Sequence, residues 1–217
     1  MKDMNSVQSS LREISEIRSM MERSSKFLSL SGLSGVSAGV IALIGAALIW
    51  GQSVNGPTLY AVESSLTGLV PLVDPGRTQV GFAVIVALAV LTLAVGLAMT
   101  LSIRMARRKG LPVWTKTTKF LLIDLGLPLA AGGAFTGVLI ARGLFLLAPA
   151  STLVFYGLAL LNASRYTVSE IRLVAITELL LGIAAAVWIS YALLFWAVGF
   201  GLLHILYGLV IYWKYER

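Results

Sequence analysis

Six apolar stretches, each close to the length needed to cross a lipid bilayer, constrain this chain more than any other feature. A helix rises about 1.5 Å per residue, so about 20 apolar residues cross a hydrocarbon core of about 30 Å. Only 12% of the 217 residues are charged and 58% are hydrophobic, which leaves too little polar sequence to cover a soluble domain. The sequence predicts an all-α polytopic membrane helix bundle with six spans, at residues 33–50, 80–103, 120–141, 144–161, 173–190 and 192–213.

The basic residues predict which side of the membrane each loop faces. The N-terminal segment, the loops after the second and fourth spans, and the C-terminal tail hold every Lys and Arg except Arg77 and Arg142. Loops rich in Lys and Arg stay on the cytoplasmic side of a membrane. Both termini are therefore predicted to be cytoplasmic, because an odd number of spans would put basic clusters on both sides.

The segment before the first span is predicted to form an amphipathic helix over residues 6–30, within a cytoplasmic unit at residues 1–32. Ser10 and Glu13 have the spacing of a capping box, and Leu11, Ile14 and Met21 recur on one face. Three interpretations are open: a helix lying on the anionic leaflet, a helix that docks a protein partner, or a lead-in that extends the first span. The remaining residues, 33–217, form the six-span membrane domain.

Small residues recur at four-residue spacing within the spans and predict close helix packing. Gly35 and Gly39 are one such pair, and Gly133 and Gly137 are another. Close backbone approach supplies much of the contact energy between helices in lipid. The same pattern serves packing within one chain or self-association into a homo-oligomer, and the sequence does not separate the two.

Three titratable residues fall inside predicted spans, all toward the cytoplasmic side: Asp124, Glu178 and His204. They lie roughly 7, 9 and 15 Å from the nearest basic residue at the span end, at 1.5 Å per residue. Charged side chains inside a membrane are costly and mark partners or function. If the three helices bring these residues together, they form a candidate polar cluster that Asn162, Tyr156 and Tyr207 join.

Two interpretations of this candidate cluster are open. One is a small polar cavity open to the cytoplasm, which would bind a cation, a proton or a polar ligand. The other is a set of hydrogen bonds between helices that fixes the fold. Pro128 follows Asp124 by four residues and removes the helical donor to the Asp124 carbonyl, so a kink is predicted in that span.

Several classes of chemistry are excluded or unsupported. The chain has no cysteine, which excludes disulfides, thiolate metal sites and cysteine nucleophiles, and its single histidine excludes a zinc site built from several imidazoles. No metalloprotease or P-loop motif occurs. The basic run at residues 104–119 is explained by topology. We therefore expect no cofactor, no metal, no nucleic-acid partner and no enzymatic activity.

Two segments carry a resemblance to a known family: Arg23-Ser-Ser-Lys-Phe-Leu-Ser-Leu-Ser-Gly-Leu-Ser-Gly35 and Phe195-Trp-Ala-Val-Gly-Phe-Gly-Leu-Leu-His-Ile-Leu-Tyr-Gly208. They resemble an uncharacterised family of bacterial six-span inner-membrane proteins, over most of the chain. The resemblance implies a bacterial cytoplasmic-membrane location and brings no activity and no site residues.

Two functions are weighed for such a membrane protein. The first is a non-enzymatic accessory, scaffold or sensory component, whose amphipathic N-terminal helix could dock a partner. The alternative is a small transporter or substrate-binding membrane subunit with a polar site in the cytoplasmic half of the bundle. The stripe Ala38, Ala42 and Ala46 supports the alternative, since it is similar to the stripe with which substrate-capturing subunits of vitamin importers bind their transport module.

Overall fold

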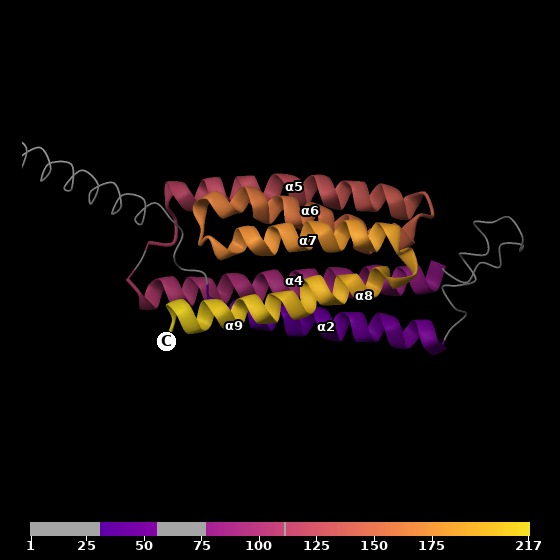
Figure 1. Ribbon diagram of the computed structural model, residues 1–217, viewed down its shortest axis with the longest axis horizontal. Helices are drawn as coiled ribbons and strands as arrows, with labels where there is room; N and C mark the ends of the chain where they lie inside the picture. Colours follow the sequence, from indigo (N-terminus) through magenta and orange to yellow (C-terminus); the bar gives the residue numbers. More distant parts are fainter. Residues whose placement is uncertain (1–30, 56–76, 111) are drawn as a thin grey trace, which may run out of the picture.

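The computed structural model describes residues 31–55, 77–110 and 112–217, and this part of the chain is built from helices (Figure 1). The predicted helix at residues 6–30 lies outside the described residues, as do residues 56–76. The long helices are α2 (Gly32–Asn55), α4 (Arg77–Arg108), α5 (Lys116–Ala141), α6 (Ala148–Ala163) and α7 (Glu170–Val187). The last column of the bundle joins α8 (Ala192–Trp196), the π-helical segment η4 (Ala197–Leu203) and α9 (His204–Tyr215). Short 3-10 turns precede α6, α7 and α8: η1 (Phe145–Leu147), η2 (Ser164–Tyr166) and η3 (Ile189–Tyr191).

The helices form two groups that lie side by side (Figure 1). In one group α6 packs between α5 and α7. In the other, α2 packs against both α4 and the column of α8, η4 and α9. The two groups meet where α6 and α7 contact α8 and η4. The last column therefore belongs to one group and also forms the seam with the other.

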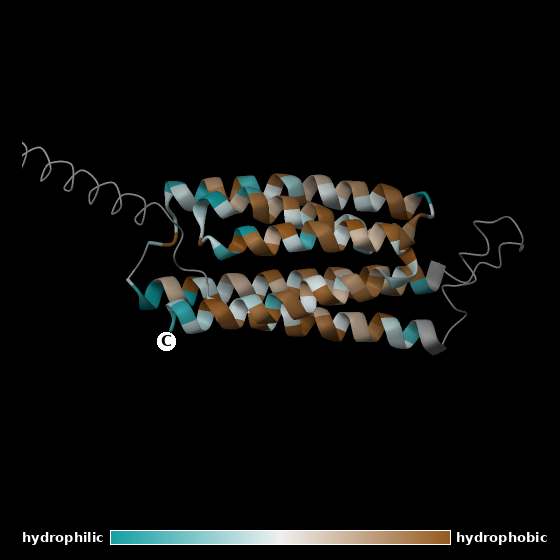
Figure 2. Cartoon of the chain, viewed as in Figure 1, coloured by the Kyte–Doolittle hydropathy of each residue, from teal (hydrophilic) through white to brown (hydrophobic). Residues whose placement is uncertain are grey.

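One end of the bundle collects polar and basic side chains, coloured teal in Figure 2. The start of α2, the end of α4, the start of α7 and the end of α9 meet there. Lys109 lies 3.5 Å from the Tyr215 carbonyl, Lys214 pairs with Glu170, and the Glu216 carboxylate accepts from the backbone N–H of Gly32. We call this the basic end.

The surface between the two ends is apolar, as a membrane-embedded protein requires. Only 6% of the apolar window of α4 is buried, and Ile85 and Leu93 are 68% and 61% exposed. Exposed apolar area on this scale is unfavourable in water by about 25 cal/mol per Å². Lipid is the solvent in which such a helix is stable.

Five helical segments in the described part of the chain are long and apolar enough to cross a membrane. They cover Gly32–Gln52, Gln79–Arg108, Lys116–Ala141, Phe145–Tyr166 and Ile189–Tyr215. The remaining predicted span corresponds to α7, which has 18 residues and carries Glu170, Arg172 and Glu178. Its charge separates it from the other five, although it lies alongside α6 (Figure 1).

The small residues of α2 are used within the chain. A Cβ at Gly39 would lie 2.5 Å from the carbonyl oxygen of Gly201, and one at Gly35 would lie 3.0 Å from the Cα of Gly208. These glycines let the α2 backbone approach the last column closely. By contrast, a Cβ at Gly133 or Gly137 would meet no atom within 4 Å.

The alanine stripe of α2 is also occupied within the chain. Ala42 and Ala46 are only 3% and 6% exposed. Ala38, the first residue of the stripe, is half-buried.

Helix α5 begins at a side-chain cap, because the Thr115 hydroxyl accepts from the backbone N–H of Thr118 at 3.1 Å. It then runs from Lys116 to Ala141 without a break at Pro128. Gly143, with φ of +79°, allows the chain to turn toward α6. Among the described columns the last one is interrupted, at η4, whereas α5 continues through Pro128.

Candidate functional site

The π-helical segment η4 places one glycine, Gly199, at the seam between the helix groups, and a second, Gly201, against Leu43 of α2. A π-helix bonds each residue to the one five positions away, and single π turns inside α-helices occur often at functional sites. Gly199 and Gly201 are buried within η4. The Gly199 carbonyl lies 3.0 Å from Nδ1 of His204, the residue five positions on, so a side chain takes up this backbone acceptor.

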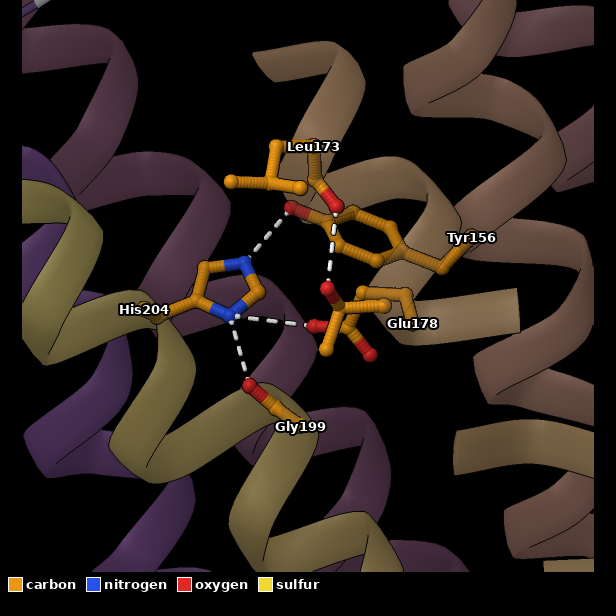
Figure 3. Close-up of polar contacts among 6 residues, drawn as sticks. Tyr156, Leu173, Glu178, Gly199 and His204 are labelled. Carbon is orange, nitrogen blue, oxygen red and sulfur yellow. Dashed lines mark hydrogen bonds and ion pairs between the residues drawn. The ribbon is translucent and has the colours of Figure 1, made fainter. Parts of the chain in front are cut away.

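His204 connects three parts of the bundle (Figure 3). Its Nε2 lies 2.7 Å from the hydroxyl of Tyr156 on α6. Its Nδ1 faces both the Gly199 carbonyl at 3.0 Å and Oε1 of Glu178 on α7 at 3.5 Å. A carbonyl oxygen only accepts, so Nδ1 carries the hydrogen, and the neutral ring accepts the Tyr156 O–H at Nε2.

Glu178 is the most unusual member of this cluster. Its side chain is fully buried, and within the described part of the chain neither carboxyl oxygen has a hydrogen-bond partner. A Cβ on Gly199 would lie 2.5 Å from Oε2, so the carboxyl group packs directly on the glycine backbone. An ionised carboxylate in such a place is penalised by several kcal/mol, roughly, which favours the neutral carboxylic acid in this arrangement.

Aromatic rings cover one side of the cluster. Phe200 stands 4.9 Å from the Tyr156 ring and 5.9 Å from the His204 ring, centroid to centroid. Trp196 packs on Phe200 at 5.1 Å. These contacts hold the imidazole and the phenol in place and connect Trp196 to any movement of His204.

The structure brings together two of the three titratable residues of the predicted cluster, Glu178 and His204, and adds Tyr156. Asp124 lies apart, because α5 packs on α6 rather than on α7 or α9. Asp124 lies instead within interaction range of the Tyr166 hydroxyl. The helix arrangement thus joins Glu178 with His204, and Asp124 stands apart from this pair.

The two other residues of the predicted cluster have different surroundings. Tyr207 lies one turn beyond His204 on α9, with a buried hydroxyl that has no partner in the described part of the chain. Asn162 is half-buried near the end of α6. No hydrogen bond among the described residues joins Asn162 to Glu178 or His204.

A second polar group, at the basic end, was missed by sequence reasoning. Glu170 pairs with Lys214 and accepts hydrogen bonds from the Tyr215 hydroxyl at 3.2 Å and the Ser169 hydroxyl at 3.1 Å. Partial burial alone would raise the pKa of the Glu170 carboxyl, but the hydrogen bonds from Lys214, the backbone, Ser169 and Tyr215 outweigh it and lower the pKa below 4.5. The sequence signal that could have found this pair was an acid, Glu170, in the first turn of one helix and a base, Lys214, in the last turn of another.

The His, Asp and Glu residues of the described ranges do not gather into a group of three that could hold a metal ion. Comparisons with protein-family models, with curated proteins and with solved structures each find no match to this chain. The geometry of Glu178, His204 and Tyr156 is therefore the basis for assigning a function.

Proposed function

We propose that this chain is a six-span membrane protein that binds a proton at Glu178 and responds by changing the conformation of its last helical column. The observation that carries the proposal is a fully buried carboxyl group without a hydrogen-bond donor, beside the Nδ1 of a histidine. Ionisable residues inside a membrane protein are costly and are kept for ion pathways, proton sites or ligand contacts.

The proton state of Glu178 decides which acceptor the Nδ1–H of His204 serves. With Glu178 neutral, the Gly199 carbonyl at 3.0 Å is the nearer acceptor. After the proton leaves, the carboxylate at 3.5 Å becomes the stronger acceptor, since charge-assisted hydrogen bonds are roughly twice as strong as neutral ones.

A change of acceptor has a consequence for the backbone. The Gly199 carbonyl would lose the His204 side chain as a hydrogen-bond partner, which removes one contact that stabilises the π turn of η4. In this proposal the loss lets η4 rearrange toward an α turn. Proton binding at Glu178 is in this way linked to the geometry of the column that packs against both α2 and α7.

The role supported best is a non-enzymatic sensory or accessory component of a bacterial inner membrane, with both termini cytoplasmic. The basic end is then the cytoplasmic end, in accordance with the positive-inside rule. In this orientation the cluster lies in the cytoplasmic half of the bundle.

A proton-coupled transporter is the second candidate. The observation in its favour is that the cluster lies where the two helix groups meet, beside an interrupted helix. Transporters commonly place their binding sites at such a junction and build them from discontinuous helices. A sensor binds and releases the proton on one side, whereas a transporter carries it across.

The proton site is tested by infrared titration of the full-length protein in lipid nanodiscs. We expect the wild type to show a protonated carboxyl band at neutral pH that is absent from Glu178→Gln and present in Asp124→Asn, the matched control. A band that survives in Glu178→Gln would refute the proposal. Flux of protons into liposomes under a pH gradient would favour the transporter over the sensor.

The six-span topology is tested with single cysteines, for which the chain is suited because it has none of its own. Arg165 precedes α7 and Ser190 follows it, and both residues are exposed. In intact cells, a membrane-impermeant thiol reagent should label Ser190→Cys and Arg142→Cys and should spare Arg165→Cys and Lys109→Cys. Labelling of Arg165 and Ser190 from the same side would show that α7 does not span.

A further inference from the structure

The basic end carries its densest positive charge where α4 ends and α5 begins (Figure 2). The chain has no Asp or Glu from Gln79 to Ile123. Among the described residues, the Lys or Arg side chain that pairs with an acid is Lys214 of α9, so the cations of α4 and α5 have no acidic partner there. Topology explains why the charge lies at this end, but it does not decide which sides of the helices carry it.

On α4, Arg104 and Arg108 lie on the side that faces lipid. Exposed residues follow along this side at steps of four, three, four and four, and we call them the α4 column: Leu93, Leu97, Thr100, Arg104 and Arg108. Ala106, which lies on the opposite side of the helix from Arg104, is only 1% exposed. The arginines therefore stand at the end of an apolar surface that the bundle leaves open.

Helix α5 repeats this arrangement from its own basic end. Its exposed residues on one side form the α5 column: Lys116, Lys119, Phe120, Ile123 and Leu127. Thr118 and Leu121, on the other side, are buried. Trp114 lies just before this helix and is 64% exposed, as is typical of aromatic residues at the boundary between membrane and water.

The order of groups along each column matches a phospholipid that stands beside it. The acyl chains of such a lipid contact apolar side chains, and its phosphate lies at the level where those side chains end. A guanidinium group binds phosphate through paired hydrogen bonds, and a lysine ammonium binds it as a point charge. Two cations without acidic partners favour a headgroup with net negative charge over a zwitterionic headgroup, which carries its own cation.

We infer that the α4 and α5 columns bind anionic phospholipid, with the headgroup phosphate at Arg104 and Arg108 on one helix and at Lys116 and Lys119 on the other. The occupant is a lipid and not a free phosphate, because acyl chains have to cover the apolar part of each column. Helix α4 packs on α2, and α5 packs on α6, so the bound lipids contact both helix groups. The inference does not depend on the proton site at Glu178.

The test uses lipid-facing labels on the full-length protein, which has no cysteine of its own. A fluorophore on Thr100→Cys or Ile123→Cys reports the lipid next to one column, and lipids brominated in their acyl chains quench it on contact. Each cation near an anionic headgroup strengthens binding by about fivefold. In mixed vesicles, brominated phosphatidylglycerol should therefore quench both labels more effectively per mole than brominated phosphatidylcholine, by about fivefold or more.

Substitutions should act on one column at a time. Arg104→Gln with Arg108→Gln should abolish the preference for phosphatidylglycerol at the α4 label and leave the α5 label unchanged. Lys116→Gln with Lys119→Gln should do the reverse.

The matched control is Lys109→Gln with Arg217→Gln. It removes the same charge from the basic end but lies outside both columns, since the Lys109 ammonium lies 3.5 Å from the Tyr215 carbonyl and Arg217 follows the end of α9. Neither label should respond. If a column variant fails to fold, the wild type still gives a test, because inorganic phosphate at constant ionic strength should leave the quenching by phosphatidylglycerol unchanged.

The outcomes separate this inference from the proton site. Equal quenching by the two lipids in the wild type overturns the inference, as does an equal loss of preference in the control and in the column variants. Displacement of the lipid by inorganic phosphate would assign the cations to a soluble anion and overturn it as well. None of these outcomes bears on the infrared band of Glu178, so the proton site is judged separately.

Discussion

Replacing Glu178 by leucine should make the protein more stable while abolishing proton binding. The carboxyl group is fully buried and unpaired in the described part of the chain, and leucine has a similar size, so the replacement leaves no large cavity. His204 keeps its hydrogen bonds to Tyr156 at 2.7 Å and to the Gly199 carbonyl at 3.0 Å. What the substitution removes is mainly an unsatisfied polar group.

The size of the gain follows from that unsatisfied group. A buried polar group without a partner costs about 1–3 kcal/mol. In a domain of this length each kcal/mol shifts the melting temperature by about 2–4 °C. Glu178→Leu should therefore melt about 2–12 °C above the wild type, whereas most substitutions at fully buried positions are destabilising.

The assay is thermal unfolding in detergent micelles, followed by circular dichroism at the same protein and detergent concentration for each variant. Glu170→Leu is the control, because that carboxyl is partly exposed and paired with Lys214. It should give no gain in melting temperature. If Glu178→Leu melts several degrees below the wild type, the carboxyl makes net favourable contacts. The claim that this position holds an unsatisfied polar group, kept for function, is then wrong.

Three further predictions follow from the packing and charges. Gly199→Ala would bring a Cβ to 2.5 Å from Glu178 Oε2 and 2.6 Å from Leu153 Cδ2, so overpacking should lower the stability by about 1–3 kcal/mol. This loss of stability should be smaller in the double variant with Glu178→Ala, and the difference is measured as a coupling energy from melting curves. Gly39→Val should lower the melting temperature because its Cβ meets the Gly201 carbonyl at 2.5 Å and Ile205 Cγ1 at 2.7 Å, whereas Gly133→Val, which meets nothing within 4 Å, should not; equal effects would contradict the α2–α9 packing. Because the folded pKa of Glu170 lies below its ordinary value of 4.5, the Glu170–Lys214 pair contributes its stability fully above that value and loses it as pH falls through the lowered folded pKa. Since both side chains are partly exposed, the contribution is at most about 1 kcal/mol, and Glu170→Gln should remove this part of the acid sensitivity in melting curves taken against pH.

The helical class and the positions of the apolar helices could be predicted from the sequence, because hydropathy over a window of about 20 residues is a local property. The structure gives five spans by length and apolarity, and α7 differs from them through Glu170, Arg172 and Glu178. The gathering of basic residues at one end also follows from the sequence, because the basic segments alternate along the chain and successive helices run in opposite directions. The residue types Glu178 and His204 stand out for the same reason, since a charge inside an apolar stretch needs an explanation.

Which polar residues meet was decided by tertiary structure alone. Asp124 and Glu178 look alike in the sequence, yet α5 packs on the far side of α6, so Asp124 meets Tyr166 while Glu178 meets His204. The spatial order of helices depends on side-chain fit along whole faces, and no local pattern encodes it.

The π turn at η4 was likewise beyond the sequence. Proline marks a break in the hydrogen-bond pattern of a helix, and Pro128 led to the expectation of a kink in α5, which is one continuous helix from Lys116 to Ala141. The break falls instead where Gly199 lies against Glu178 and Gly201 lies against Leu43. Those contacts join residues far apart in the chain, so the extra residue in the turn is stabilised by packing that only the folded bundle supplies.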